Sequence, residues 1–123
     1  EFSAVTGACM LVKKELFTSV GGFDENLAIA YNDIDLCLKI KALGFRVVWT
    51  PYAELIHHES ISRGDDFQTE KYERLKKEGE YLLNRWRDII QNDSAYSPNL
   101  TVEAENFGLA WPPRLKELRG LKF

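Results

Sequence analysis

The sequence predicts an α/β domain, because short apolar runs alternate along it with segments of helical periodicity. Three apolar runs, at residues 5–12, 45–49 and 53–56, have the length and composition of buried strands. The 123 residues, 45% hydrophobic and 28% charged, suffice for one domain with its own core. A formal net charge of −3 provides no broad basic surface, so we expect no nucleic-acid partner.

The first elements are a strand and a short helix. Residues 5–12 are small or apolar and predict a buried strand that Gly7 interrupts. Residues 13–20 place three apolar side chains at helical spacing, and Gly21-Gly22 is typical of the residues that end a helix.

A second helix and two short strands follow. Asn32 or Asp33 is predicted to cap a helix that ends at Gly44. The β-branched centre of residues 45–49 predicts a strand, and residues 53–56 form another apolar run that leads into His57-His58.

The last third consists of a long helix and an irregular tail. An apolar stripe with a period of 3.6 residues predicts a helix from about residue 66 to residue 91. Periodicity is lost afterwards, and prolines mark the tail. We therefore divide the chain into residues 1–64, a compact α/β part, and residues 65–123, a helix with an irregular extension.

Cysteine usage and hydropathy bear on location. Cys9 and Cys37 lie in apolar stretches without metal-ligand spacing, so we expect free, buried thiols in a reducing compartment. No apolar run approaches the roughly 20 residues that span a bilayer. We expect a cytoplasmic protein, whose mildly basic tail at residues 114–122 allows peripheral contact with the inner face of the cell membrane.

Asp33 and Asp35 are the first candidate functional residues. Two positions apart on a helix, they cannot both face one ligand, so one would face a cleft while the other caps or orients. The alternative is purely structural: an N-cap and a first-turn carboxylate that favours the helix dipole. A helix N-terminus also favours the ionised carboxylate and so weakens it as a base.

His57-His58 and three smaller motifs complete the candidates. Only one of two neighbouring histidines on a strand can enter a given site, and the other would be exposed. Arg63 could hold a phosphate, although a solvated loop residue is the alternative. The pairs Gly7-Ala8 and Gly21-Gly22 permit close backbone approach to a ligand, and turn geometry explains these glycines equally well.

Several motifs in order resemble the second half of a family 2 glycosyltransferase. They are Thr6-Gly7-Ala8-Cys9-Met10, Val20-Gly21-Gly22-Phe23-Asp24-Glu25, Asn32-Asp33-Ile34-Asp35-Leu36-Cys37-Leu38, Gly44-Phe45-Arg46-Val47-Val48 and Pro51-Tyr52-Ala53. The resemblance covers residues 4 to 64 tightly. It extends loosely through Trp86 and residues 96–100, in the manner of rhamnosyltransferase-like enzymes that build bacterial surface polysaccharides.

The resemblance implies a GT-A fold, which is a Rossmann-like α/β sandwich, and an inverting transfer. The donor would be a nucleotide-diphosphate sugar, the acceptor a saccharide or lipid-linked hydroxyl, and the cofactor Mn or Mg. Asp33 matches the general base and Asp35 the supporting acid. Asn32 stands where the family often has Glu, and His57 matches a metal ligand in some relatives, with His58 as the alternative. Gly7, Ala8, Gly21, Gly22, Asn32 and Arg63 fall near the substrates.

The same resemblance implies that part of the enzyme lies elsewhere. The chain opens on Glu1-Phe2-Ser3 and enters an apolar segment at once, so we expect a piece of a longer protein. The nucleotide-binding N-terminal half with its Asp-x-Asp motif would be missing, and the fragment alone would be inactive. We expect a homodimer or strand exchange to cover the apolar surface left open. The alternatives are a non-catalytic interaction module derived from this fold and a metal-dependent hydrolase using His57-His58 with Asp33.

Overall fold

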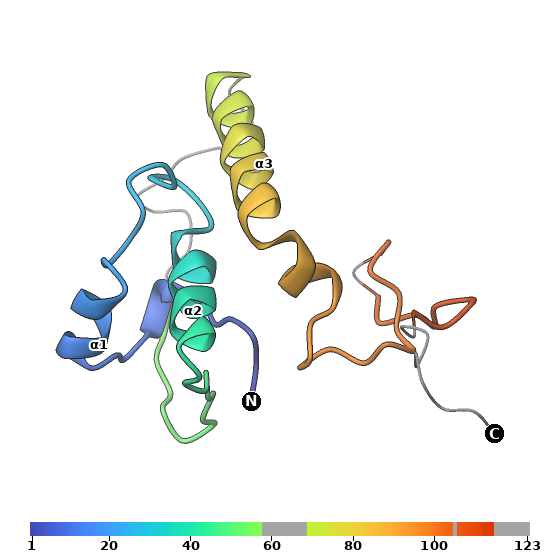
Figure 1. Ribbon diagram of the computed structural model, residues 1–123, viewed down its shortest axis with the longest axis horizontal. Coiled ribbons are helices and arrows are strands. Elements are labelled where there is room, and N and C mark those ends of the chain that lie inside the picture. The colour runs from blue at the N-terminus through green and yellow to red at the C-terminus, as the bar shows by residue number, and fades with distance from the viewer. Residues whose placement is uncertain (58–68, 105, 115–123) are drawn as a thin grey trace.

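The computed structural model describes residues 1–57, 69–104 and 106–114 and consists mostly of helices (Figure 1). A 3-10 turn covers Gly7–Cys9, and three α-helices follow: α1 at Lys14–Ser19, α2 at Asn32–Ala42 and α3 at Thr69–Gln91. All three predicted helices are therefore confirmed over the described residues. The predicted boundary between residues 64 and 65 lies outside them.

The predicted strands are not formed within the described residues. Residues 5–12 form the 3-10 turn and irregular chain, and residues 53–56 are irregular and exposed. In residues 45–49 only Val47 pairs, through an isolated antiparallel bridge in which the Phe2 N–H donates to its carbonyl at 3.0 Å. An extended segment becomes a strand only when a neighbour pairs its backbone groups. The described residues thus do not confirm an α/β sheet.

Glycines end the first two helices, as predicted. Gly21 (φ 76°) and Gly22 (φ 65°) follow α1, and the Gly22 N–H donates to the Phe17 carbonyl at 2.9 Å. Gly44 (φ 84°) follows α2 in the same way, with the Phe45 N–H on the Ile40 carbonyl at 3.3 Å. These are the backbone bonds of a Schellman-type helix end, which requires a left-handed residue.

The start of α2 differs from the prediction. The residue before the helix is Tyr31, in the left-handed region at φ 63°, and its side chain makes no capping hydrogen bond. Asn32 and Asp33 lie inside the first turn, so neither is the N-cap. The prediction of a side-chain cap here is wrong: the helix begins after Tyr31, and its first hydrogen bond is the backbone bond from the Asp35 N–H to the Tyr31 carbonyl at 2.9 Å.

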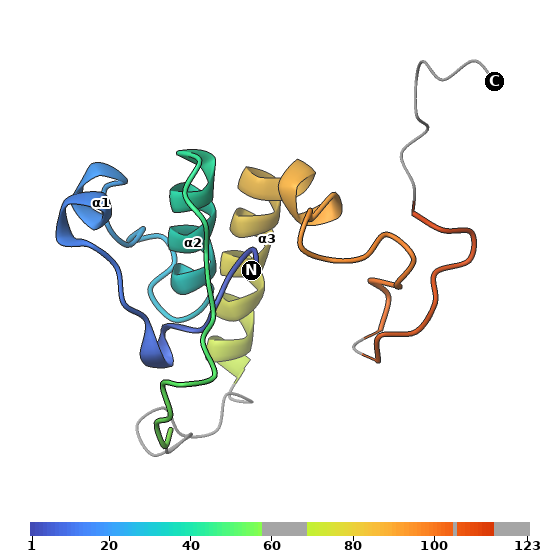
Figure 2. The ribbon, with the colours of Figure 1, turned by 90° about the horizontal axis from the view of Figure 1, so that it is seen from below.

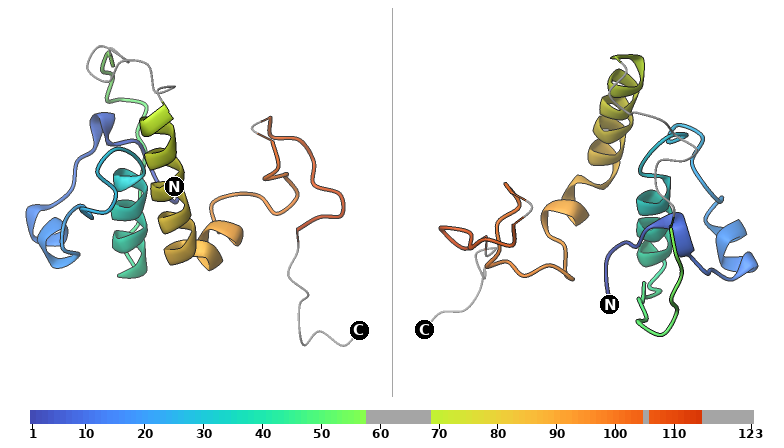
Figure 3. Two further views of the ribbon diagram at one scale, coloured as in Figure 1. Left: turned by 90° about the horizontal axis from the view of Figure 1, so that it is seen from above. Right: turned by 180° about the vertical axis from the view of Figure 1, so that it is seen from behind.

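Helix α3 runs beside α2 in the same direction (Figures 2 and 3). Successive contacts join residue 30 to 78, residue 35 to 86 and residue 41 to 93. The backbone of α3 departs from helical angles at Trp86 (φ −117°, ψ 17°), the residue whose indole reaches α2. The buried core lies along this contact and under the loop before α2; it includes Leu27, Leu36, Leu38, Ile40 and Leu82.

The chain after α3 forms a small lobe built on backbone bonds. Leu100 and Leu109 pair in an isolated antiparallel bridge, and the Thr101 N–H donates to the Gly108 carbonyl at 2.7 Å. The Arg114 guanidinium donates to the Leu100 carbonyl at 2.9 Å and lies 5.5 Å from the centre of the Tyr96 ring. Arg114 therefore ties together the segments of this lobe.

Candidate functional site

Asp33 and Gly7 meet where the 3-10 turn approaches the start of α2. The Gly7 N–H donates to Asp33 Oδ2 at 2.8 Å, and the Ile34 N–H donates to Asp33 Oδ1 at 2.8 Å. The Asp33 side chain is half-buried. Two backbone donors therefore fix the orientation of this carboxylate while part of it stays accessible to solvent.

Close approach explains why residue 7 is a glycine. A Cβ placed on Gly7 would lie 3.3 Å from Asp33 Cβ, so a side chain there would press on the aspartate. Thr6 caps the turn by accepting from the Ala8 N–H at 3.3 Å, and Ala8 is exposed. The predicted candidates Gly7 and Asp33 are thus neighbours.

Asp35 lies on a different side of α2 and is fully buried, at 0% exposure. Its Oδ1 accepts from Trp86 Nε1 at 2.7 Å and lies 3.4 Å from an Arg85 nitrogen. Its Oδ2 lies 2.9 Å from Lys39 Nζ, although no described donor is well aligned with it. The two predicted aspartates therefore occupy separate environments: Asp33 beside a turn, Asp35 in the contact between α2 and α3.

The loop between α1 and α2 is held by α3 at both ends. At its start, Asp24 accepts from the Tyr81 hydroxyl at 2.9 Å and from Arg85 at 2.6 Å. The hydrogen bond from the Asn26 N–H is the main cause that lowers the pKa of Asp24 to about 2. Partial desolvation raises this pKa, and the Tyr81 hydroxyl, the Asn26 side-chain amide and the Arg85 charge lower it further. At the end of the loop, Glu78 accepts from two consecutive backbone N–H groups.

Gly21-Gly22 and Asn32 complete the described part of the predicted substrate-binding set. The Gly22 carbonyl accepts from Lys39 Nζ at 3.1 Å, which ties the end of α1 to α2. A Cβ on Gly22 would lie 3.0 Å from the Phe17 ring, whereas one on Gly21 would meet open space. Asn32 is the first residue of α2 and is half-buried.

The predicted metal ligand is described only in part. His57 is exposed, while His58 and Arg63 lie outside the described residues. Among residues 1–57, 69–104 and 106–114, no three His, Cys, Asp or Glu side chains come close enough to hold a metal ion. The described donors therefore do not fit a divalent metal, and we assign no chemical step to one.

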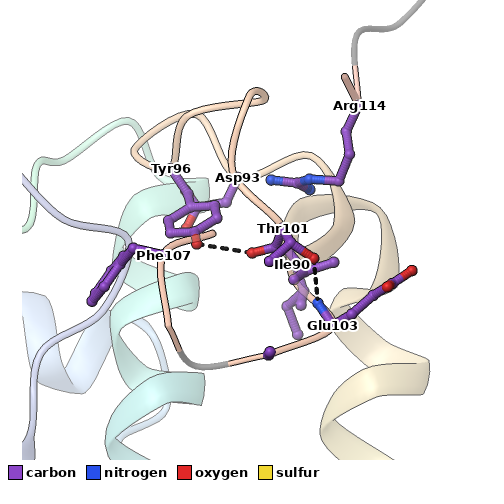
Figure 4. A pocket seen from close by; sticks show the side chains of 9 residues that line it. Ile90, Asp93, Tyr96, Thr101, Glu103, Phe107 and Arg114 are labelled. Atoms are coloured by element: carbon purple, nitrogen blue, oxygen red, sulfur yellow. Dashed lines mark hydrogen bonds between the residues drawn. The ribbon is translucent and has the colours of Figure 1, made fainter. Parts of the chain in front are cut away.

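A cavity of about 510 Å³ lies apart from Asp33, between the end of α3 and the lobe that follows it (Figure 4). Its walls include Asp93, Tyr96, Thr101 and Arg114. The Tyr96 hydroxyl donates a hydrogen bond to the Thr101 carbonyl at 2.9 Å. None of the predicted site residues that the structure describes lines it. No helix in the described parts of the chain is long and apolar enough to cross a membrane.

Curated bacterial proteins, named for O-antigen biosynthesis and for rhamnosyl transfer, are similar in sequence to this chain. The chain is 38% identical over 89% of its length to an O-antigen biosynthesis protein of Myxococcus xanthus. It is 39% identical over 50% of its length to the N-acetylglucosaminyl-diphospho-decaprenol L-rhamnosyltransferase of Mycobacterium tuberculosis. This chain is homologous to glycosyltransferases of the family 2 type. A third relative, an uncharacterised protein of Sinorhizobium fredii, is 49% identical over 90% of the chain.

These relatives are much longer than the matched region. The chain spans 12% of the Sinorhizobium protein, 8% of the Myxococcus protein and 20% of the mycobacterial enzyme. No family model matches the chain, and no solved structure matches it.

Sequence reasoning missed two buried polar contacts. We did not predict that Asp35 would accept from Trp86, or that Glu78 would accept from the backbone before α2. One signal was present: Glu78 and Gly79 interrupt the apolar stripe of α3 at positions where a core side chain is expected. A polar residue and a glycine at the centre of a docking face indicate a specific partner there.

Proposed function

We propose that this chain is the acceptor-side segment of an inverting glycosyltransferase and that Asp33 is its general base. The donor would be a nucleotide-diphosphate sugar and the acceptor a hydroxyl of a saccharide or of a lipid-linked glycan. The observation that supports this most is the fixed, half-buried carboxylate of Asp33 beside Gly7, in a chain whose relatives include a rhamnosyltransferase.

The geometry of Asp33 is compatible with proton abstraction. An ionised carboxylate offers about four lone-pair sites, and two of them are taken by the Gly7 and Ile34 N–H groups. The remaining sites can accept the proton of an acceptor hydroxyl as its oxygen attacks the anomeric carbon. The bond from that carbon to the diphosphate then breaks, the diphosphate leaves with the electron pair, and a single displacement inverts the configuration.

Asp35 would serve this site indirectly. Its buried carboxylate joins α2 to Trp86 and Arg85 of α3, which fixes the helix on which Asp33 stands. Gly7, Ala8, Gly21, Gly22, Asn32 and Arg63 remain proposed substrate contacts. His57 remains the proposed metal ligand for Mn or Mg, with the rest of the metal site supplied from outside the described residues.

The exposed apolar side chains favour a further covering element. Leu11 is 101% exposed, Leu55 73% and Ile56 84%. We propose that the nucleotide-binding half of the domain covers them in the longer protein and that a second copy of the chain does so in its absence. The isolated chain would therefore not catalyse transfer.

The decisive experiment replaces Asp33 by Asn in the intact transferase and assays it against a panel of nucleotide sugars. We expect turnover to fall by about 10²–10⁴-fold, the usual contribution of a general base. Asp88→Asn, an exposed aspartate of α3, is the matched control and should keep activity. Full activity in Asp33→Asn would contradict the assignment and favour a non-catalytic module.

Two measurements on the isolated chain test the covering element. Calorimetry with a nucleotide sugar and manganese should give no tight binding, because the nucleotide-binding half is absent. Light scattering at high concentration should give a dimeric mass. A tight calorimetric signal would contradict the first expectation, and a monomeric mass would contradict the second.

A further inference from the structure

We infer that Glu78 of α3 is a positioning residue for Asp33, acting through the backbone of residues 29–31. This inference rests on the proposed role of Asp33 and extends it to a residue 45 positions later in the chain. The link is a continuous series of backbone contacts between the two carboxylates.

The first step is the contact between Glu78 and the loop. Glu78 is only 4% exposed, and its Oε2 accepts from the Ala30 N–H at 2.7 Å and from the Ile29 N–H at 3.1 Å. Arg74 lies 3.1 Å from the other oxygen and balances the charge. A buried carboxylate that accepts from two consecutive N–H groups forms strong, charge-assisted bonds and fixes both peptide planes.

The second step is the strained residue that follows. Tyr31 adopts φ 63°, a left-handed conformation that costs a residue with a side chain about 1–2 kcal/mol and persists only where the surroundings impose it. Glu78 fixes the peptides before Tyr31, and the Tyr31 ring lies against Gly79, where a Cβ would be in van der Waals contact with the ring edge at 3.4 Å. Neighbouring residues of α3 thus impose the turn that opens α2.

The third step leads from the turn to the candidate base. The Tyr31 carbonyl accepts from the Asp35 N–H, which closes the first turn of α2 with Asp33 inside it. The direction of the Asp33 side chain, and hence its bond to the Gly7 N–H, follows from this turn. Loss of Glu78 would therefore free the turn and misalign Asp33 even though Glu78 does not contact it.

Amide hydrogen exchange on this chain tests the link without any enzyme assay. In Glu78→Ala we expect the amides of Ile29 and Ala30 to exchange about ten-fold faster or more, the scale of a lost hydrogen bond to a charged group. The amide of Gly7 should accelerate with them, whereas Phe17 of α1, which bonds to the Lys13 carbonyl, serves as the internal reference. Glu80→Ala, an exposed glutamate of the same helix, is the matched control and should change none of these amides.

Glu78→Gln keeps an acceptor oxygen and most of the side-chain volume, so relative to Glu78→Ala it should restore part of the protection of the Ala30 and Gly7 amides. It also provides a variant that can be measured if Glu78→Ala unfolds. Unchanged exchange at Gly7 while Ile29 and Ala30 accelerate would overturn the inference, because the contact would then be local. Equal acceleration at Phe17 would also overturn it, because the effect would then be general loosening.

Kinetics of the intact transferase provide a second readout. Glu78→Gln should lower kcat about ten-fold while KM for the donor stays constant, since orientation of the base affects the chemical step. A rise in KM with kcat unchanged would overturn the positioning role. Should Asp33→Asn retain full activity, the proposed function fails, and the exchange experiment still decides whether Glu78 orders the turn at Asp33.

Discussion

The α2–α3 pair and the open segments, which we define as residues 6–11 and 45–57, are similarly apolar in sequence but differ in burial. In α2, Leu36 is 1% exposed and Leu38 is 2% exposed, whereas in the open segments Leu55 is 73% and Tyr52 is 93% exposed. The two open segments come close to each other near the 3-10 turn (Figures 1 and 2). Hydrophobicity alone therefore does not decide burial; the presence of a second packed element does.

The pair is also distinguished by buried polar contacts. Asp35 and Glu78 are buried carboxylates that connect α3 to α2 and to the loop before it. The open segments join the rest of the chain through backbone groups, among them the Val47 carbonyl, which accepts from the Phe2 N–H, and the Gly7 N–H, which donates to Asp33. Buried carboxylates thus hold the α2–α3 pair together, whereas many apolar side chains of the open segments are exposed.

The largest effect should come from removing the charge at the centre of the pair. Asp35→Ala leaves the Trp86 indole N–H and the Lys39 ammonium without their carboxylate, and breaking a buried ion pair costs about 3–5 kcal/mol. Denaturant unfolding measures the loss. Asp88→Ala on the exposed face of α3 should stay within about 0.5 kcal/mol, and an equal loss in both variants would contradict the comparison.

The same substitution at a buried and at an exposed leucine tests how much burial contributes to stability. Leu36→Ala should lower the free energy of unfolding by about 2–5 kcal/mol, because it removes packed atoms and leaves a cavity. At a concentration low enough to keep the chain monomeric, Leu55→Ala should change it by no more than about 0.5 kcal/mol, because this side chain is exposed within a single copy. Similar losses for both leucines, measured by the same unfolding assay, would show that the open segments are packed in solution.

The pH dependence of stability tests the contact between the loop and α3. The pKa of Asp24 is about 2 in the folded chain, below its usual value of 3.8. A depressed carboxyl pKa contributes stability that is fully present above about pH 4 and is lost as pH falls through about 2. Wild type should therefore exceed Asp24→Asn in stability at pH 5–7, and the difference should shrink between pH 4 and 2. A stability difference between wild type and Asp24→Asn that stays constant from pH 4 to 2 would contradict a stabilising contact at ionised Asp24.

The smallest perturbation is chemical labelling of the two thiols. The structure corrects the prediction that both of them are buried. Cys37 is buried, as predicted, and burial raises the pKa of its thiol; Cys9 is exposed, contrary to prediction. Iodoacetamide should therefore modify Cys9 and spare Cys37 in the folded chain, and it should modify both in denaturant, as read by mass spectrometry. Rapid labelling of Cys37 under native conditions would mean that the chain around Val5, whose carbonyl lies 3.9 Å from the Cys37 sulfur, moves away from α2.

The sequence predicted the parts of the fold that depend on local information. The helices and the glycines after Val20 and Leu43 were found because periodicity and left-handed backbone are encoded within a few residues. The strand at residues 45–49 was expected from its β-branched centre, but pairing depends on a neighbour that no local pattern specifies. Only Val47 is bridged.

The candidate site was predictable in its residues and not in its contacts. Asp33 and Gly7 were both singled out, and they are hydrogen-bonded to each other across 26 positions. Asp35 was grouped with Asp33 because both begin one helix, yet it faces Trp86, 51 positions later. Spacing does not show which residues meet over such separations. The interruption of the α3 stripe at Glu78 and Gly79 indicated a contact but not its partner, which came from the structure.

The separation between Asp35 and Trp86 has a consequence for synthesis in the cell. A ribosome adds about 5–20 residues per second, so roughly 3–10 s pass between incorporation of Asp35 and of its indole partner. During that interval α2 carries a hydrated carboxylate and leucines with nothing to cover them. The nascent chain is therefore open to chaperones and to premature association until the last turns of α3 emerge.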